Sequence, residues 1–228
     1  MALLTKSVPG EISGKMGNAV VRKMNGKLFI SQRPSKYKKH RGKIPARLKM
    51  RTVIPFCAAL NRIGDLKKVW EKADINAGNA YQKMVKHALE NSGPERLSTN
   101  NKITPGGVQL IPDRFDLINE TVFIDISNDT KGLNSIIDNG LSAYLLFYLY
   151  EPLDKIKDSG KLFLVKKNLD GESVKDGLYF DYKVEKYYKK LLDNYGKCIV
   201  YFAVVSIDIN NDNLKYSDTI SKKFNLTG

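Results

Sequence analysis

The stretch SAYLLFYLYEPL, residues 142–153, is an almost unbroken run of apolar and aromatic side chains. A second run of the same kind, CIVYFAVVSI, occupies residues 198–207. Each run is about ten residues long, roughly half of what an apolar helix needs to cross a bilayer. Aromatic and β-branched side chains of this density are typical of strands. We therefore expect two long strands and no membrane span.

Five further segments around these two runs have the same strand character. Turn signals such as PGG, NDT, DNG, DSG and NND separate most of them. Strands at such spacing are typical of a β-sandwich of immunoglobulin-like character, which we predict for residues 101–228. Residues 184–196 depart from the pattern and predict a short amphipathic helix. The predicted strands cover residues 107–111, 121–127, 142–150, 161–166, 178–184, 197–208 and 215–224.

The region before the sandwich, residues 44–95, has the spacing of helices. From Pro45 onward apolar residues recur three and four positions apart, and Pro55 lies inside this pattern, where it should kink or split the helix. A second helix is predicted at residues 65–73, with Leu66, Val69 and Trp70 on its inner face, and a third at about residues 76–90. The chain is thus predicted to be α+β, with a short helical segment before the sandwich.

The N-terminal segment, residues 1–43, predicts a basic β-ribbon or arm. AVVRKM and KLFISQR, residues 19–24 and 27–33, flank the pair Asn25-Gly26, which is the strongest local sign of a two-residue hairpin. The glycines of this segment do not match a nucleotide-binding fingerprint, because neither G-x-G-x-x-G nor G-x-x-x-x-G-K-[ST] occurs in it. We therefore do not expect an enzyme's phosphate loop.

Positive charge is concentrated at this end of the chain. Residues 1–51 contain 14 Lys or Arg and one acid, whereas residues 101–228 contain 17 basic and 18 acidic side chains. Concentrated like charge repels itself and does not stabilise a fold. The segment is therefore expected to meet phosphates, a polyanion or an acidic protein surface.

Groups that could catalyse a reaction are sparse, and we predict that the chain is not an enzyme. Cys57 and Cys198 lie in apolar segments and are expected to be buried thiols, and neither histidine has a neighbour at metal-ligand spacing. The scattered aspartates fit turn positions better than a catalytic pair or a calcium loop. The tyrosines of residues 144–201 fit half-buried sandwich positions better than a stacking platform for bases or sugars. We predict no cofactor, no metal and no small-molecule substrate.

The pattern G-x-x-S-G-K-x-G-N-x-V, followed by K-x-x-G-K and a basic R-P, spans residues 10–34. It resembles a family of uncharacterised proteins from Bacteroidota and their phages, in which a glycine-rich start precedes an arginine-bearing helix and a β-rich C-terminal region. Residues 143–152 and 200–219 also look similar to that family, so the resemblance spans most of the chain. Met24 stands where the family usually has tryptophan, and Pro55 is a second departure. The resemblance implies no reaction or ligand; it implies a phage structural protein of the capsid, its decoration, the portal or the tail.

Our leading hypothesis is a non-enzymatic virion protein, made in the cytoplasm of a bacterial host, whose arm docks onto neighbouring subunits or packaged DNA. Partners would be further copies of the chain or other virion proteins, with no membrane. Glycines at the close backbone contacts would be Gly14, Gly17 and Gly26. The side chains expected to make the contact are Lys15, Arg22, Lys23, Lys27, Arg33, Lys36, Lys38, Lys39, Arg41 and Lys43.

Two other function classes stay open. A non-specific DNA- or RNA-binding protein would use the same cations against phosphates, with a steep dependence on salt. A secreted carbohydrate-binding sandwich is less favoured, because residues 1–14 contain only a three-residue apolar block and no signal peptide is recognisable.

Overall fold

A computed structural model describes residues 2–3, 14–16, 19–24, 27–32, 44–127, 136, 141–154, 160–169, 174, 177–208 and 213–226. Contacts divide the chain into two compact units, Met1–Gly42 and Lys43–Gly228. The predicted mixture of helices and strands is confirmed, and strands account for most of the regular structure.

The first unit is a small antiparallel sheet with the strand order β1-β4-β3-β2. The predicted hairpin is present in it, because β3 and β4 pair from Ala19↔Gln32 to Met24↔Lys27. Among the side chains that the structure describes in this unit, only Val21 is fully buried. The strands are β1 (Ala2–Leu3), β2 (Gly14–Met16), β3 (Ala19–Met24) and β4 (Lys27–Gln32).

The second unit is built around a five-stranded antiparallel sheet with the order β11-β10-β7-β8, in which β12 also pairs with β10. The two apolar runs of the sequence form its central pair, aligned from Leu141↔Ser206 to Pro152↔Tyr195. The strands are β7 (Leu141–Pro152), β8 (Lys161–Asn168), β10 (Tyr195–Asp208), β11 (Asn213–Tyr216) and β12 (Ile220–Asn225).

Both faces of this central pair are covered, and this explains the unbroken apolar runs. Residues 141–150 of β7 are all buried. Leu145, Phe147 and Leu149 belong to one apolar cluster, whereas Tyr144 and Tyr148 belong to a second cluster on the opposite face. A strand that is half-buried would alternate apolar and polar side chains, whereas a strand covered on both faces does not.

A three-stranded sheet of order β5-β6-β9 covers one face. Its middle strand alternates as expected for a sheet with one solvent face, with Val122, Ile124 and Ile126 buried against the larger sheet. Helix α5, which lies within the predicted range 184–196, packs at the same side, where Tyr188 stacks on Phe163 with ring centroids 4.2 Å apart. The elements are β5 (Arg114–Ile118), β6 (Thr121–Ser127), β9 (Gly177–Lys183) and α5 (Lys186–Leu192).

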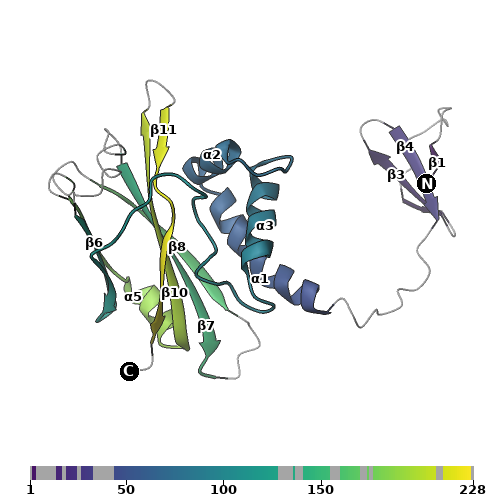
Figure 1. Cartoon of the computed structure of the whole chain (residues 1–228). Helices are drawn as coiled ribbons and strands as arrows, with labels where there is room; N and C mark the ends of the chain where they lie inside the picture. Colours follow the sequence, from purple (N-terminus) through teal and green to yellow (C-terminus); the bar gives the residue numbers. More distant parts are fainter. Residues whose placement is uncertain are drawn as a thin grey trace. The chain divides into compact units, whose positions relative to one another are not determined.

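Three helices cover the other face of the five-stranded sheet, so the unit has three layers (Figure 1). The helices are α1 (Ile44–Asn61), α2 (Gly64–Lys72) and α3 (Ala80–Asn91). The predicted inner face of α2 is confirmed, because Leu66 and Trp70 are fully buried against the sheet.

The segment between the helices and the first sandwich strand is fixed by buried hydrogen bonds. The side chain of Asn101 accepts from the backbone of Ser98 and donates to the carbonyl of Ala88. The indole of Trp70 donates to the carbonyl of Ile103 at 2.9 Å. These bonds fix this segment against α2 and α3.

Two predicted elements differ in the structure because of local backbone constraints. Residues 107–111 do not form a strand; Val108 makes only an isolated parallel bridge to Ser217. The glycines before it have positive φ angles, 71° at Gly106 and 90° at Gly107, which an extended strand cannot contain. The predicted strand 215–224 is interrupted by Ser217 and becomes β11 and β12.

The helix predictions need smaller corrections. Pro55 does not split α1, which continues from Ile44 to Asn61. Helix α3 begins at Ala80 rather than near residue 76, because the side chain of Asn79 accepts a hydrogen bond from the backbone of Gln82 and caps the helix. Strand β5 was not predicted, since only Phe115 of its five residues is fully buried.

Candidate basic binding surface

The predicted contact side chains of the N-terminal unit are only partly within the described residues. Lys15 and Lys23 lie on β2 and β3, where their backbone is described. Arg22 on β3 and Lys27 on β4 are exposed. Gly14 is the first residue of β2. The other predicted positions lie outside the described residues: Gly17, Gly26, Arg33, Lys36, Lys38, Lys39, Arg41 and Lys43.

The hairpin brings Arg22 and Lys27 to one face. Arg22 pairs directly with Phe29 across the two strands, and Lys27 lies two residues before Phe29 on β4. Side chains two residues apart on a strand, and side chains directly opposite across a pair, share a face of the sheet. Two exposed cations therefore lie beside a half-buried aromatic ring. This arrangement suits contact with an anionic surface.

Helix α1 continues the cationic run into the folded body. Arg47 and Arg51 on α1, and Arg62 directly after it, are exposed. The site predicted from sequence ended at Lys43 and missed these arginines. The charge count already included Arg47 and Arg51, and their four-residue spacing was the available signal that they share a helix face.

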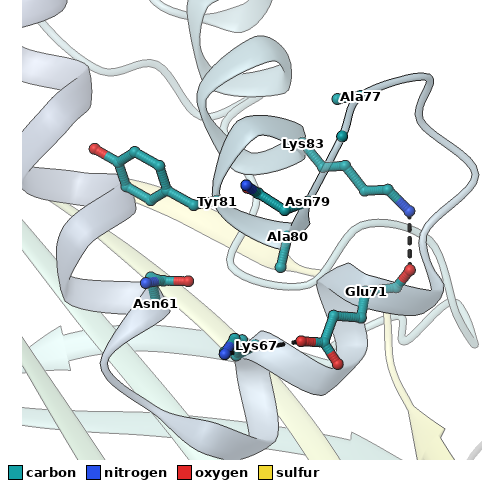
Figure 2. A pocket seen from close by; sticks show the side chains of 9 residues that line it. Asn61, Lys67, Glu71, Ala77, Asn79, Ala80, Tyr81 and Lys83 are labelled. Atoms are coloured by element: carbon teal, nitrogen blue, oxygen red, sulfur yellow. Dashed lines mark hydrogen bonds and ion pairs between the residues drawn. The ribbon is translucent and has the colours of Figure 1, made fainter. Parts of the chain in front are cut away.

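A pocket of about 570 Å³ lies where the ends of α1 and α2 meet the start of α3 (Figure 2). Its polar groups are engaged with one another. Lys83 donates to the backbone carbonyls of Glu71 and Ala73 at 2.9 and 2.6 Å, and Lys67 lies 3.9 Å from the Glu71 carboxylate (Figure 2). The Lys83 bonds satisfy carbonyls at the C-terminal end of α2, so these polar groups of the pocket serve to cap that helix.

A second pocket, of about 600 Å³, is lined by Arg96, Tyr150, Glu151 and neighbouring prolines. The carboxylate of Glu151 lies 2.6 Å from the Lys197 ammonium and 3.5 Å from the Arg96 guanidinium. The Lys197 hydrogen bond lowers the pKa of Glu151 more than its slight desolvation raises it. The guanidinium of Arg96 also lies 5.8 Å from the centre of the Tyr150 ring. The charges of Arg96 and Glu151 are thus already paired within the chain.

The buried titratable groups that could act as nucleophiles or bases lie in the core. Cys57 and Cys198 are free and buried, as predicted, and burial raises the pKa of each thiol to about 12. His87 packs edge-on against Trp70 with centroids 5.6 Å apart, and burial lowers its pKa. A thiol with a raised pKa carries little of the reactive thiolate at neutral pH.

The tyrosines singled out in the sequence divide between core and surface. Tyr144, Tyr148 and Tyr201 are fully buried beneath the helical layer, where no base or sugar could reach them. Tyr179 and Tyr187 are exposed, at 58% and 75%. Most of the rings that a stacking platform would need are therefore buried.

One charged cluster ties α2 to the sheet. Tyr144 donates its hydroxyl to the carboxylate of Asp65, and the Lys166 ammonium donates to the same oxygen at 2.7 Å. Partial burial alone would raise the pKa of Asp65, but the hydrogen bonds from Lys166 and Tyr144 outweigh it, so the pKa lies below its usual value. Burial and the nearby carboxylate raise the pKa of Tyr144.

Within the described ranges no group of three or more His, Cys, Asp or Glu side chains could hold a metal ion. In the same part of the chain no helix is both long enough and apolar enough to span a bilayer. In comparisons with known proteins, no family model matches the sequence and no curated protein matches it.

Proposed function

We propose that this chain is a non-enzymatic structural protein of a phage virion, whose basic N-terminal unit docks onto neighbouring subunits or packaged DNA. The resemblance of residues 10–34 to a family of Bacteroidota and phage proteins supplies the virion context. The specific position, at the capsid, the portal vertex or the tail, is left open by this proposal.

The observation that carries the proposal is the contrast between the two units. The first unit, Met1–Gly42, contains 10 Lys or Arg and a single acid, and among its described side chains only Val21 is fully buried. Domains below about 40 residues usually need a disulfide, a metal or a partner to be stable. A small cationic sheet with so little buried apolar surface gains stability when it docks on an anionic or apolar partner.

The same proposal treats residues 101–228 as a sandwich of immunoglobulin-like character. Support comes from two antiparallel sheets that share one apolar cluster, which includes Ile124, Phe147 and Phe180. The helical layer on the outer face of the larger sheet is an addition to such a sandwich.

Two experiments test the virion assignment. Mass spectrometry of purified phage particles should find the protein at many copies, and its absence from particles would refute the proposal. Deleting residues 1–43 should leave a soluble remainder with a cooperative melting transition that no longer assembles. A deletion variant that is unfolded would show that the first unit belongs to the core instead.

The alternative is a non-specific DNA- or RNA-binding protein, favoured by the same cations. With six to ten phosphate contacts, affinity would fall by roughly 10³ to 10⁵ between 50 and 200 mM salt. Docking onto a protein would depend on salt much less. Binding of a labelled DNA duplex and a labelled RNA hairpin across this salt range, together with the particle analysis, separates the two functions.

A further inference from the structure

Strand β8 is an edge strand of the larger sheet, with β7 as its neighbour on one side. The backbone of Leu169 donates to the carbonyl of Leu141 at 2.9 Å, and this bond sets which residues of the strand are hydrogen-bonded to β7. Within the described residues, no segment other than β7 forms backbone hydrogen bonds with β8. The residues that turn their N–H and C=O groups away from β7 are Leu162, Leu164, Lys166 and Asn168.

The other edge strands of the second unit are engaged by further parts of the same chain. On β5, β9 and β11 a backbone carbonyl accepts a hydrogen bond from outside the sheet pairing. The pairs are Phe115 with Lys222, Asp181 with Lys167 and Tyr216 with Val108. Strand β12 is shorter than β8, and the Ser221 hydroxyl near its start donates to the carbonyl of Thr99 at 2.7 Å. Among the described strands of this unit, β8 therefore presents the longest open edge.

The features that usually block an edge strand are absent or turned aside in β8. Proteins protect such edges with proline, bulges or exposed lysines, and β8 contains no proline. The ammonium of Lys166 is held at 2.7 Å by Asp65 of α2, and Lys167 donates to the carbonyl of Asp181 on β9 at 3.0 Å. The lysines thus reach toward the two layers on either side of the sheet.

Strand β8 also leaves apolar surface at this edge. Residues 141–150 of the neighbouring β7 are all buried, whereas Leu162, Leu164 and Val165 of β8 are only partly buried. A further strand beside β8 would cover these side chains and satisfy the open backbone groups.

We propose that β8 pairs in an antiparallel manner with β8 of a second copy of this chain, so that the two larger sheets become one continuous sheet. A two-fold axis at Val165 sets Leu164 opposite Lys166 of the second copy, and Leu162 opposite its Asn168. All four outward residues of each strand are then bonded, by about eight backbone hydrogen bonds in total. The pairing involves only the second unit and goes beyond the proposed function.

The side chains of β8 complement one another in this register. On the face toward the smaller sheet, Val165 meets Val165 of the second copy, and the ring of Phe163 meets the side chain of Lys167. Like charges directly opposite each other destabilise a strand pair, and this register contains none. An axis at Leu164 would instead place Lys161 opposite Lys167. The sequence of β8 therefore favours the axis at Val165.

An extended segment of a different protein is the competing occupant, because edge pairing through backbone groups accepts many sequences. The second copy is favoured because the same edge supplies both partners in a closed two-fold arrangement, which is the commonest symmetry of soluble oligomers. The two occupants differ in whether a cysteine at the axis links two identical chains.

The first test measures the mass of the full-length chain by sedimentation velocity from about 1 to 100 μM, where the wild type should form a dimer. Leu164→Pro removes an N–H donor that β7 does not use, and its ring would clash with the second strand. It should raise the dimer Kd at least about tenfold. Thermal melting checks that each variant is folded.

Lys223→Pro is the matched control on the opposite edge of the same sheet. The backbone of Leu226 donates to the carbonyl of Gly196, so Lys223 turns its N–H away from β10, as Leu164 turns its own away from β7. This variant should leave the dimer Kd within about twofold of the wild type, because the two edges are independent sites.

A cysteine at the axis tests the register and decides the question if Leu164→Pro does not fold. In the proposed pair the two copies of residue 165 face each other without a hydrogen bond between them, with Cα atoms about 4.5 Å apart, which a disulfide can bridge. Val165→Cys should therefore give a reducible covalent dimer under mild oxidation. Lys167→Cys should not, because its two copies would lie about 14 Å apart. Cys57 and Cys198 are buried and are common to both variants.

Four results would overturn the inference. One is a wild-type chain that stays monomeric up to about 100 μM, and another is a folded Leu164→Pro variant that dimerises as tightly as the wild type. The third is an equal loss of dimer in Lys223→Pro, which would assign the contact to the opposite edge. The fourth is a Val165→Cys variant that forms no covalent dimer.

Failure of this inference and failure of the proposed function give different results. A chain found in virions that is monomeric in solution loses only the β8 interface. A chain that is absent from virions but forms the Val165→Cys dimer loses the virion assignment and keeps this interface.

Discussion

Removing one hydroxyl group from the cluster between α2 and the sheet should cost measurable stability. Tyr144 is fully buried and donates to the carboxylate of Asp65, which the ammonium of Lys166 also contacts. The substitution Tyr144→Phe keeps the ring and removes the donor. A hydrogen bond to a charged group contributes about 1.5–3 kcal/mol to stability. The Asp65 side chain is 26% exposed and keeps Lys166, so water and the lysine replace part of the loss, and we expect about 1.5 kcal/mol.

The dependence on pH gives this prediction its direction. The pKa of Asp65 lies below its usual value because Lys166 and Tyr144 stabilise the carboxylate against the effect of burial. Between the folded pKa and the unfolded value of about 3.9, the unfolded chain binds more protons. The stabilisation is therefore fully present above the unfolded pKa and is lost as the pH falls through the folded pKa. The stability difference between wild type and Tyr144→Phe should be largest near pH 7 and shrink in acid.

Urea denaturation followed by circular dichroism measures the stability difference between the wild type and Tyr144→Phe. The measurement is repeated from pH 7 down to the lowest pH at which the chain stays folded. At neutral pH the melting temperature should fall by about 3–6 °C, given about 2–4 °C per kcal/mol for a chain of this size. Tyr179→Phe is the matched control, because its ring is 58% exposed, and it should change neither quantity. Equal stability of wild type and Tyr144→Phe at pH 7, or a difference that grows as the pH falls, would refute the role given to this cluster.

Three other predictions concern the core and the fixed backbone. Cys57 and Cys198 should resist a thiol reagent at pH 8 in the native chain and react quickly in urea, since burial raises the pKa of each thiol to about 12. Rapid labelling of the native chain would contradict their burial. Gly107→Ala should destabilise the chain by about 1–3 kcal/mol, because φ is +90° and the new methyl carbon would lie 2.4 Å from the carbonyl oxygen of Tyr216. The midpoint of urea denaturation tests this, provided that the dependence of the unfolding free energy on urea is unchanged. An unchanged midpoint would contradict the prediction. Trp70→Phe should lower stability by about 1–3 kcal/mol, because a buried backbone carbonyl loses its indole donor, and a calorimetric melting temperature equal to that of the wild type would disprove this.

The proposed function depends on how positive charge is distributed along the chain. This distribution can be read from the sequence alone. Counting Lys and Arg along the chain locates the cationic first quarter without any structure. The hairpin was equally readable, because Asn25-Gly26 between two strand-like runs is a local signal. The pairing of β3 with β4 confirms it. The exposure of Arg47 and Arg51 on α1 was harder to predict, because the prediction requires knowing which side of the helix packs on the core.

What the sequence by itself determined is therefore local: the strand character of residues 142–150, the inner face of α2, and the cationic first quarter. The tertiary structure decided which of these surfaces meet. An unbroken apolar strand does not show what covers each of its faces, and only the packing of α1–α3 over Tyr144 and Tyr148 shows that the face turned away from the smaller sheet is covered as well. Likewise Pro55 breaks a helix by local rules, yet α1 continues through it, since Phe56, Cys57 and Leu60 are buried beyond it. Proline inside a helix costs about 3 kcal/mol, and burial of several core side chains outweighs this local penalty.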